Sequence, residues 1–257
     1  MMAMASAQRG RRPPASGGRP TPGLMRQLRE HTAGVHAATE ALPLMQTVLS
    51  PRPSPAGYRR YLLTLHGVYT AVEPALYAAV PAALVAELGI APKLPALQQD
   101  LQALPPTTPT AARGPPAAGP LAAEGLRTRV DRLLAAAGAQ RTATALGGLY
   151  VLEGATLGGQ VIARRLRSNW PGAAPGSGWG TGQELAQAEQ VSQAPAPAPL
   201  PTAFLEFRSY QGTGDWRRFG VALEAWAAQA PGSEPAVLDG ALRIFGAMHA
   251  AFAEAGG

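Results

Sequence analysis

The sequence predicts a single all-α domain of six to eight helices, with proline-rich loops between some of them. Apolar residues recur at helical spacing in several segments, whereas no segment alternates apolar and polar residues as a strand would. Alanine and leucine, two strong helix formers, dominate these segments. The chain also holds 30 glycines and 26 prolines among its 257 residues. Since the prolines gather in a few places, they indicate where the loops lie.

Residues 1–20 form a basic, proline- and glycine-rich leader that we expect to be disordered, and residues 21–255 form the helical domain. Arginines of this leader account for most of the formal net charge of +6. A nucleic-acid-binding domain carries its basic face on the folded part, so we expect no nucleic-acid partner. No run of 18 apolar residues occurs, which predicts no membrane span and a cytoplasmic protein. The absence of cysteine excludes disulfides, iron–sulfur clusters and thiolate nucleophiles.

Prolines and hydroxyl residues predict the helix boundaries of the first half of the chain. Thr21-Pro22 is a helix start signal, and so is Ser54-Pro55. A helix-interior proline removes a backbone donor, so we expect a kink at Pro74. The predicted helices cover residues 21–42, a stretch from residue 55 through this kink, and residues 81–104, weakened at Pro92 and Pro95. Residues 50–57 are predicted to be a loop, and residues 105–120 an irregular connector.

The sequence of the second half predicts four further helices, of which the first is weakly patterned. They cover residues 121–137, 141–170, 216–228 and 235–253. Pro171 ends the long second helix, and a proline-rich loop follows over residues 171–201. A short segment over residues 204–210 precedes the last two helices.

Few side chains offer reaction chemistry. The four histidines are His31, His36, His66 and His249, and none has the spacing of a Glu-x-x-His or His-x-x-x-His metal site. Motifs of serine hydrolases, phosphate loops and dinucleotide-binding turns are also absent. A chain with so few reactive groups favours a function based on a bound reactive cofactor.

His36 is the strongest candidate among the histidines. On a helix, Arg29 lies within about 20° of its direction and Glu40 about 40° beyond it, so one face offers a cation, an imidazole and a carboxylate. A metal-bound imidazole needs an acceptor on its second nitrogen, and a carboxylate one turn away can supply it. On spacing alone, a half-buried histidine with a solvated partner is the commoner explanation. His31 points about 140° away and is predicted to lie on the surface.

A second candidate is the segment Tyr150–Gln160, which places Gly154, Gly158 and Gly159 inside a predicted helix. Each interior glycine costs about 1 kcal/mol relative to alanine, so three glycines in six residues need a reason. The helix backbone could approach a large flat ligand, or it could pack closely on another helix. The segment alone slightly favours packing. The glycines should also let the helix bend.

Taken together, the two segments resemble the heme oxygenase family. Leu28-Arg29-x-x-Thr32-x-x-x-His36-x-x-x-Glu40 resembles the proximal helix of that family, and Tyr150–Gln160 resembles its distal helix. The form Tyr-Val-Leu-Glu-Gly-x-Thr-Leu-Gly-Gly is similar to the bacterial branch found beside bacteriophytochromes. Trp216 also falls where that branch has its next motif. The resemblance covers roughly residues 22–252, and the loops 105–120 and 171–201 match poorly.

The resemblance implies a heme oxygenase-like helical bundle and a role for eight residues. His36 would be the axial ligand of the heme iron, with Glu40 bonded to its second nitrogen, and Arg29 and Arg208 would bind the heme propionates. The catalytic distal wall would consist of Gly154, Ala155, Gly158 and Gly159. Animal members of the family have an aspartate at the position of Ala155, whereas the bacteriophytochrome-linked branch usually has a small residue there.

The activity implied by the resemblance is cleavage of heme, with O2 and reducing electrons, to biliverdin, CO and ferrous iron. Heme would be both substrate and cofactor. The electrons would come from an external donor, either a ferredoxin or an NADPH-linked reductase, and a bacteriophytochrome is a candidate recipient of the product. Two alternatives stay open: a non-catalytic heme-binding or carrier protein, and a cofactor-free helical interaction domain of the same fold.

Overall fold

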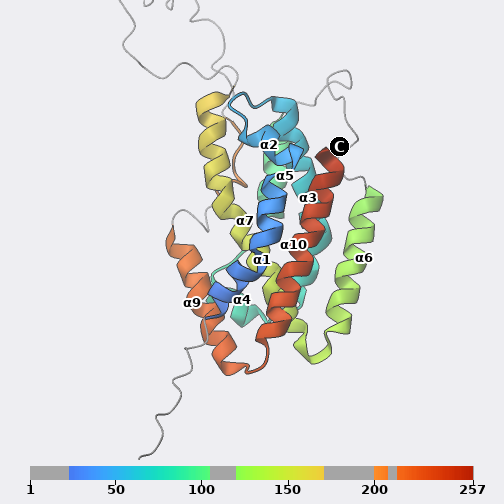
Figure 1. Cartoon of the computed structure of the whole chain (residues 1–257), viewed down its shortest axis with the longest axis vertical. Coiled ribbons are helices and arrows are strands. Elements are labelled where there is room, and N and C mark those ends of the chain that lie inside the picture. Colours follow the sequence, from blue (N-terminus) through green and yellow to red (C-terminus); the bar gives the residue numbers. More distant parts are fainter. Residues whose placement is uncertain (1–22, 105–119, 171–199, 208–212, 257) are drawn as a thin grey trace, which may run out of the picture.

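The computed structural model describes residues 23–104, 120–170, 200–207 and 213–256, and Figure 1 shows their arrangement. No strand occurs within these ranges, which confirms the prediction of an all-α fold. The helices are α1 (Leu24–Glu40), α2 (Pro43–Leu49), α3 (Pro55–Ala78), α4 (Ala82–Leu88), α5 (Leu94–Ala103), α6 (Pro120–Ala136), the short 3-10 helix η2 (Gly138–Gln140), α7 (Arg141–Asn169), α9 (Thr213–Gln229) and α10 (Glu234–Gly256).

The described part contains nine α-helices, so the expected six to eight was too few. Pro43 occupies the first position of α2, a separate short helix. The stretch predicted as one helix over residues 81–104 consists of α4 and α5, because Gly89 ends α4 in the left-handed conformation with φ 68°. α3 continues through Pro74 to Ala78.

The start of α1 also differs from the prediction. The helix begins at Leu24 with Gly23 as its N-cap, and no side chain of its own caps it. Instead, the Glu224 carboxylate of α9 accepts hydrogen bonds from the backbone N–H groups of Leu24 (2.9 Å) and Met25 (2.8 Å). A carboxylate at a helix N-terminus satisfies free donors and is stabilised by the helix dipole. The cap therefore comes from a distant part of the chain.

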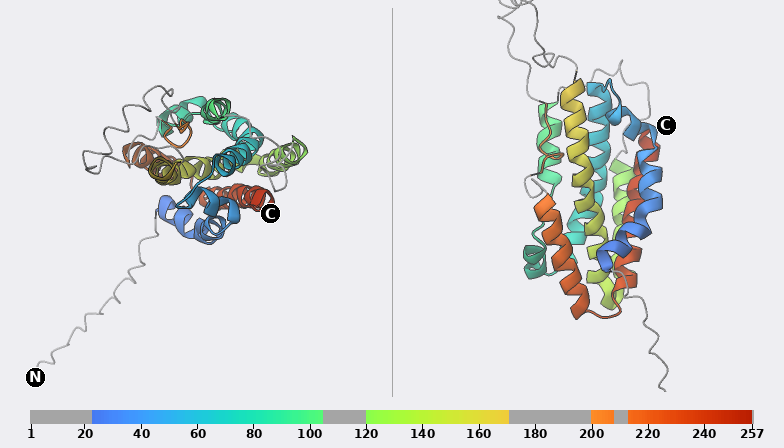
Figure 2. Two further views of the ribbon diagram at one scale, coloured as in Figure 1. Left: turned by 90° about the horizontal axis from the view of Figure 1, so that it is seen from above. Right: turned by 60° about the vertical axis from the view of Figure 1, so that its left-hand side comes forward.

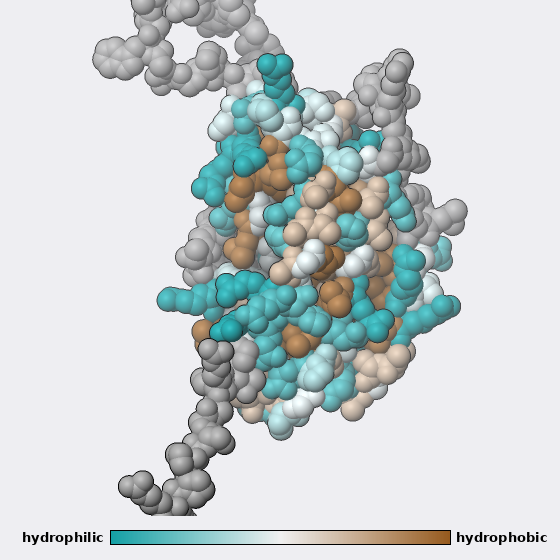
Figure 3. Space-filling model, in the orientation of Figure 1, coloured by the Kyte–Doolittle hydropathy of each residue, from teal (hydrophilic) through white to brown (hydrophobic). Residues whose placement is uncertain are grey.

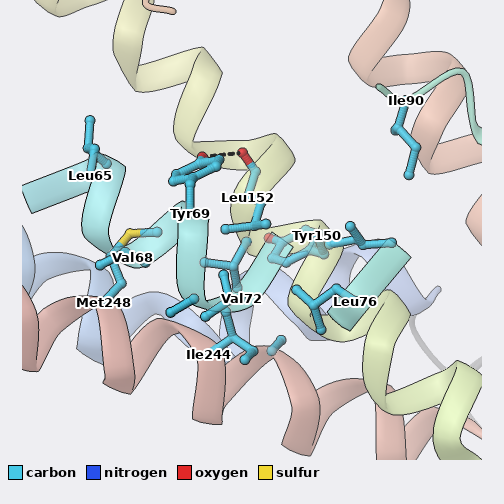
Figure 4. Packing of buried hydrophobic residues seen from close by; sticks show 14 of the residues in the cluster. Leu65, Val68, Tyr69, Val72, Leu76, Ile90, Tyr150, Leu152, Ile244 and Met248 are labelled. Carbon is cyan, nitrogen blue, oxygen red and sulfur yellow. Dashed lines mark hydrogen bonds between the residues drawn. The ribbon is translucent and has the colours of Figure 1, made fainter. Parts of the chain in front are cut away.

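Helix α10 is the helix on which much of the bundle packs. It contacts α7, α1, α2 and α3, and Figures 1 and 2 show it between α1 and the inner helices. By length and composition α10 is apolar enough to cross a membrane, with α3 and α4 as a second, bent candidate. Core helices of soluble proteins satisfy the same criterion. One third of this apolar stretch of α10 is buried, and Ile244 and Met248 are among the side chains it contributes to the core (Figure 4).

The closest helix–helix contact lies near the beginnings of α7 and α10. A Cβ atom added at Gly147 of α7 would overlap the carbonyl oxygen of Val237 and lie 2.6 Å from the amide nitrogen of Ala241. On the other helix, a Cβ at Gly240 would overlap the carbonyl oxygen of Thr144. The two backbones are therefore in direct contact here, and any side chain at either glycine would separate them.

Candidate functional site

The glycines of the Tyr150–Gln160 segment lie in three different environments. A Cβ atom at Gly159 would lie 3.0 Å from the carbonyl oxygen of Leu205, so this glycine permits close packing. A Cβ at Gly154 would make an ordinary contact of 3.6 Å with Trp216 of α9. A Cβ at Gly158 would meet nothing within 4 Å, and this residue is exposed. Packing therefore explains one of these glycines and leaves Gly158 without a structural reason.

Helices α1 and α7 run in the same direction along the long axis of the bundle (Figures 1 and 2). The level at which they face each other is fixed by Tyr150 of α7. The Tyr150 hydroxyl forms a hydrogen bond with the Thr32 side chain of α1, and the Arg29 guanidinium of α1 lies nearby. Burial raises the pKa of this hydroxyl, and both of these α1 residues oppose the rise. His36 lies one turn beyond Thr32, and Gly154 one turn beyond Tyr150. Parallel helices therefore place His36 and Gly154 at the same level of the bundle.

α10 supports both helices, and one of its side chains supports the imidazole. The Phe245 ring of α10 meets the His36 ring edge-on, with 5.8 Å between ring centroids. Two turns of α1 below, Arg29 approaches Tyr150. We call the surface formed by His36, Phe245, Tyr150, Gly154 and Gly158 the candidate face.

The upper part of α7 adds apolar surface next to the candidate face. Figure 3 shows a strip of apolar side chains along the α7 side of the molecule. Val161 lies three residues after Gly158, so the two share a helix face, and it is 42% exposed. Large exposed apolar side chains are few among the described residues, and only Val221 and Leu242 join it. Apolar surface beside an accessible imidazole suits a flat apolar ligand.

The imidazole of His36 is accessible and has a carboxylate beside it. Its side chain and that of Glu40 are each 59% exposed, and Nδ1 lies 3.7 Å from Oε2 of Glu40. This distance is longer than a hydrogen bond, so the two groups face each other without being tightly joined. Because Nδ1 faces the carboxylate, Nε2 is the nitrogen directed away from it. A neutral imidazole arranged in this way can bind a metal through Nε2.

For the remaining predicted site residues, the structure gives exposure and helix position, and for His249 one contact. Arg29 is exposed on the same side of α1 as His36, and Ala155 is half-buried next to Gly154. Arg208 lies outside the described residues. His31 is exposed, as expected, whereas the Nδ1 atom of His249 on α10 lies 3.1 Å from Oγ1 of Thr39 on α1. In the described ranges, no three histidine, aspartate or glutamate side chains are grouped as a metal site would need, so His36 stands as a single potential ligand.

Next to Gly154, α7 carries one residue of a buried ion pair that the sequence reasoning missed. Nζ of Lys93, just before α5, bonds to Oε1 of Glu153 on α7, and both side chains are fully buried. Nζ also donates to the carbonyl oxygen of Ala91 (3.1 Å), and the Tyr77 hydroxyl lies 3.5 Å from Oε1. Oε2 of Glu153 is buried without a hydrogen-bond partner among the described residues.

Burial dominates the electrostatics of this ion pair. It raises the pKa of Glu153 to about 7, although the Lys93 ammonium opposes the rise. Burial also raises the pKa of Glu73, whose carboxylate accepts hydrogen bonds from the backbone N–H groups of Lys93 (2.7 Å) and Leu94 (3.0 Å). Glu73 thus caps α5 and fixes the segment that carries Lys93. The only sequence signal was a glutamate in an otherwise apolar helical run.

A model of the family described as heme oxygenase matches residues 23–254. The chain belongs to the heme oxygenase family. This match covers the helical domain from the beginning of α1 almost to the end of α10, so both the His36 helix and the glycine-containing helix lie within it. No curated protein matches the sequence.

Solved heme oxygenases share the fold of this family member. The enzyme from Leptospira interrogans is 20% identical, with a TM-score of 0.61, over 90% of this chain and 99% of its own. Heme oxygenase-2 of Synechocystis, in complex with heme and NO, is 20% identical, with a TM-score of 0.57, over 91% and 85% of the two chains. The heme-free heme oxygenase 2 of Chlamydomonas reinhardtii is 19% identical, with a TM-score of 0.59, over 90% and 96%. At these identities the likeness establishes the fold.

Proposed function

We propose that the protein cleaves heme, using O2 and reducing electrons, to biliverdin, CO and ferrous iron. The observation that carries this proposal is the candidate face. There the imidazole of His36 is accessible at the level of Gly154, and the next turn of α7 presents Gly158, where a side chain would meet open space. Gly34, Gly125 and Gly246 are helical glycines that meet open space too. What distinguishes Gly158 is its place one turn beyond Gly154, on the helix that faces His36.

The residues of the candidate face fit heme. A porphyrin has two broad apolar faces and two anionic propionates, and its iron accepts a nitrogen ligand. His36 supplies the imidazole, Gly154 and Gly158 leave space at α7, and Arg29 supplies a cation on the same side of α1. Two of the solved family members are described as complexes with heme, which supports the same assignment here.

Each residue of the face has a separate task in this proposal. Nε2 of His36 would bind the iron, and the Glu40 carboxylate beside Nδ1 would help to orient the imidazole. Bound heme supplies the iron at which O2 is activated and the ring that is oxidised. The backbone of Gly154 and Gly158 forms a wall without acidic or imidazole side chains, as does the methyl group of Ala155. Arg29 and Arg208 bind the propionates, which sets the in-plane orientation of the ring.

The partners follow from the reaction. The reaction consumes electrons that neither heme nor O2 supplies, so in this proposal they come from a separate protein, a ferredoxin or an NADPH-linked reductase. The segment Tyr150–Gly159 has the form found in the bacteriophytochrome-associated branch, which supports a bacteriophytochrome as the recipient of biliverdin.

Hemin titration followed by product analysis tests the proposal. The purified protein should give a Soret band with one equivalent of hemin, and this band should decay to biliverdin absorption when O2 and ferredoxin with its reductase, or ascorbate, are added. A stable Soret band under these conditions would indicate a heme carrier instead. No Soret shift at all would indicate a cofactor-free interaction domain.

A further inference from the structure

We propose that the buried Lys93–Glu153 pair, which adjoins Gly154 on α7, is a positioning device for the catalytic wall. It fixes the turn Leu152–Thr156 of α7, and with it Gly154, at the height that the bound ring requires. This inference rests on the proposed function. The pair itself touches neither heme nor His36 in our proposal, and acts only through the backbone of α7.

The turn Leu152–Thr156 lies in a weak part of α7. Gly154 lies within it, and Gly158 and Gly159 follow one turn later, so this part of the helix has a low helix propensity and can bend. A Cβ at Gly154 would make one ordinary contact, with Trp216, and a Cβ at Gly158 would meet nothing within 4 Å. Close packing at these two glycines therefore does not fix the position of the turn, and the neighbouring side chains have to.

Two side chains from other elements anchor this turn, and a third bond forms within it. Lys93 bonds to the carboxylate of Glu153, and the Tyr69 hydroxyl of α3 donates to the carbonyl oxygen of Leu152 (3.0 Å). Within α7, Oγ1 of Thr156 donates to the carbonyl oxygen of Glu153 (2.7 Å). The turn that contains Gly154 is thus bonded at two successive residues, Leu152 to α3 and Glu153 to the residue before α5.

The anchor itself is rigid. Glu73 of α3 accepts hydrogen bonds from two successive backbone N–H groups, those of Lys93 and Leu94, so the segment carrying the ammonium group is fixed to α3. Lys93 also lies 5.3 Å from the centre of the Phe207 ring, and its side chain is fully buried. A fixed donor in a dry environment holds its acceptor within a narrow range of positions.

Fold stability alone does not explain such a pair. Removing two charges from water is costly, and apolar residues of similar volume in their place are often neutral or stabilising. The unpaired Oε2 of Glu153 adds to this cost. A costly ionic contact directly behind the glycine wall is accounted for by the precise position it gives to that wall, because a misplacement of about 1 Å can reduce catalysis about 100-fold.

The test is the double variant Lys93→Met/Glu153→Leu, which replaces the pair with apolar side chains. We expect its thermal stability to equal or exceed that of the wild type and its hemin affinity to stay within about 3-fold. We expect kcat for biliverdin formation to fall at least about 10-fold, with the C–O stretch of its ferrous–CO complex shifted. If the pair only stabilises the fold, a double variant as stable as the wild type should also have the wild-type kcat.

Two further variants keep the test decisive. If the double variant does not fold, Lys93→Met alone replaces it in the test. This variant keeps the Glu153 carboxyl, which can be protonated, and it should lower kcat by a similar factor. Replacing the exposed pair Arg26 and Glu30 with alanines is the matched control and should leave kcat and the C–O stretch unchanged. Wild-type kcat and an unshifted stretch in a folded pair variant would overturn the positioning role. Failure of the wild type itself to form biliverdin would instead overturn the proposed function and this inference with it.

Discussion

The glycines of α7 are used in two opposite ways. Near the beginning of the helix, Gly147 brings the α7 backbone into contact with α10, and a Cβ at Gly148 would lie 2.8 Å from a methyl group of Leu76. Further along, Gly159 packs closely on Leu205, whereas a Cβ at Gly158 would meet open space and one at Gly154 only an ordinary contact with Trp216. Helix propensity disfavours all five glycines to a similar extent. Gly147, Gly148 and Gly159 are compensated by packing in the folded chain, whereas Gly158 has no such compensation in the fold itself.

The comparison shows that the fold and the candidate site draw on separate residues of one helix. Substitutions at Gly147 or Gly148 should destabilise the fold, and substitutions at His36 or Gly158 should weaken ligand binding or turnover without destabilising it. The Lys93–Glu153 ion pair should affect turnover without contacting the ligand and without being needed for folding. Each expectation below tests whether this division holds.

The largest effect should come from His36→Ala on the candidate face. We expect turnover to fall more than about 1000-fold, equivalent to roughly 4 kcal/mol of lost transition-state stabilisation, because the iron loses its axial ligand. The melting temperature of the heme-free protein should not change, since the side chain is 59% exposed. Biliverdin formation and circular dichroism measure the two quantities. His31→Ala, on the same helix, is the matched control, and undiminished turnover in His36→Ala would refute the axial assignment.

Gly147→Ala should have the largest effect on stability. The new methyl group would overlap the carbonyl oxygen of Val237, so α7 and α10 must separate. We expect a loss of about 3 kcal/mol or more in the free energy of unfolding, which is a large share of a typical total. Urea denaturation measures this loss. A melting curve like that of the wild type would show that the helices can move apart without cost, and the distinction between the two uses of glycine in α7 would fail.

Gly158→Leu should separate binding from folding within α7. The heme-free protein should gain about 0.5–1 kcal/mol, because leucine has the better helix propensity and its Cβ meets no neighbour. Hemin affinity should fall at least about 100-fold, since the side chain occupies the space left for the ring. Hemin titration and urea denaturation together test this pair of opposite effects. Unchanged affinity would mean that the ligand does not lie against this turn.

The smallest effect should be the pH dependence contributed by Glu153. Burial raises its folded-state pKa from 4.5 to about 7, so between these values the folded chain keeps a proton that the unfolded chain releases. The free energy of unfolding should therefore fall as pH rises through this window, by about 1–3 kcal/mol. In Glu153→Gln this contribution is absent. Denaturation of both proteins at pH 5 and pH 8 should show the steeper loss in the wild type.

Other groups affect the same range of pH but are common to both proteins. The titratable groups around Glu153 are Lys93, Glu73, Tyr69 and Tyr77. Burial raises the pKa of Glu73 and Asp100 and lowers that of His66, so their contributions have opposite signs. Comparison with the glutamine variant removes them. Parallel pH profiles for the two proteins would contradict an elevated pKa at Glu153.

Local sequence signals predicted the parts of the fold that depend on local structure. α7 was expected over residues 141–170 and spans Arg141–Asn169, because a continuous helical pattern ends at Pro171. The start of α1 was misplaced, since its cap is Glu224, about 200 residues away. The division between α4 and α5 was missed because the sequence alone did not show that Gly89 adopts a positive φ.

The same distinction applies to the candidate site. His36 and Glu40 face each other because residues four apart on a helix are neighbours, and the sequence predicted this pair. Gly154 and Gly158 were recognised from their cost to the helix. The contact between Lys93 and Glu153 joins residues 60 positions apart and depends on the packing of α3, α5 and α7. No local pattern encodes it, and only the three-dimensional arrangement brings the two charges together.

The independence of the candidate face from the core has an evolutionary consequence. His36 and Gly158 contribute little to folding, so a duplicated copy of this gene can lose either residue and still produce a well-folded helical bundle. Overall architecture is then a poor guide to which copies keep the proposed heme site. These two positions, read directly from the sequence, are the ones that should divide active members from inactive descendants of the same ancestor.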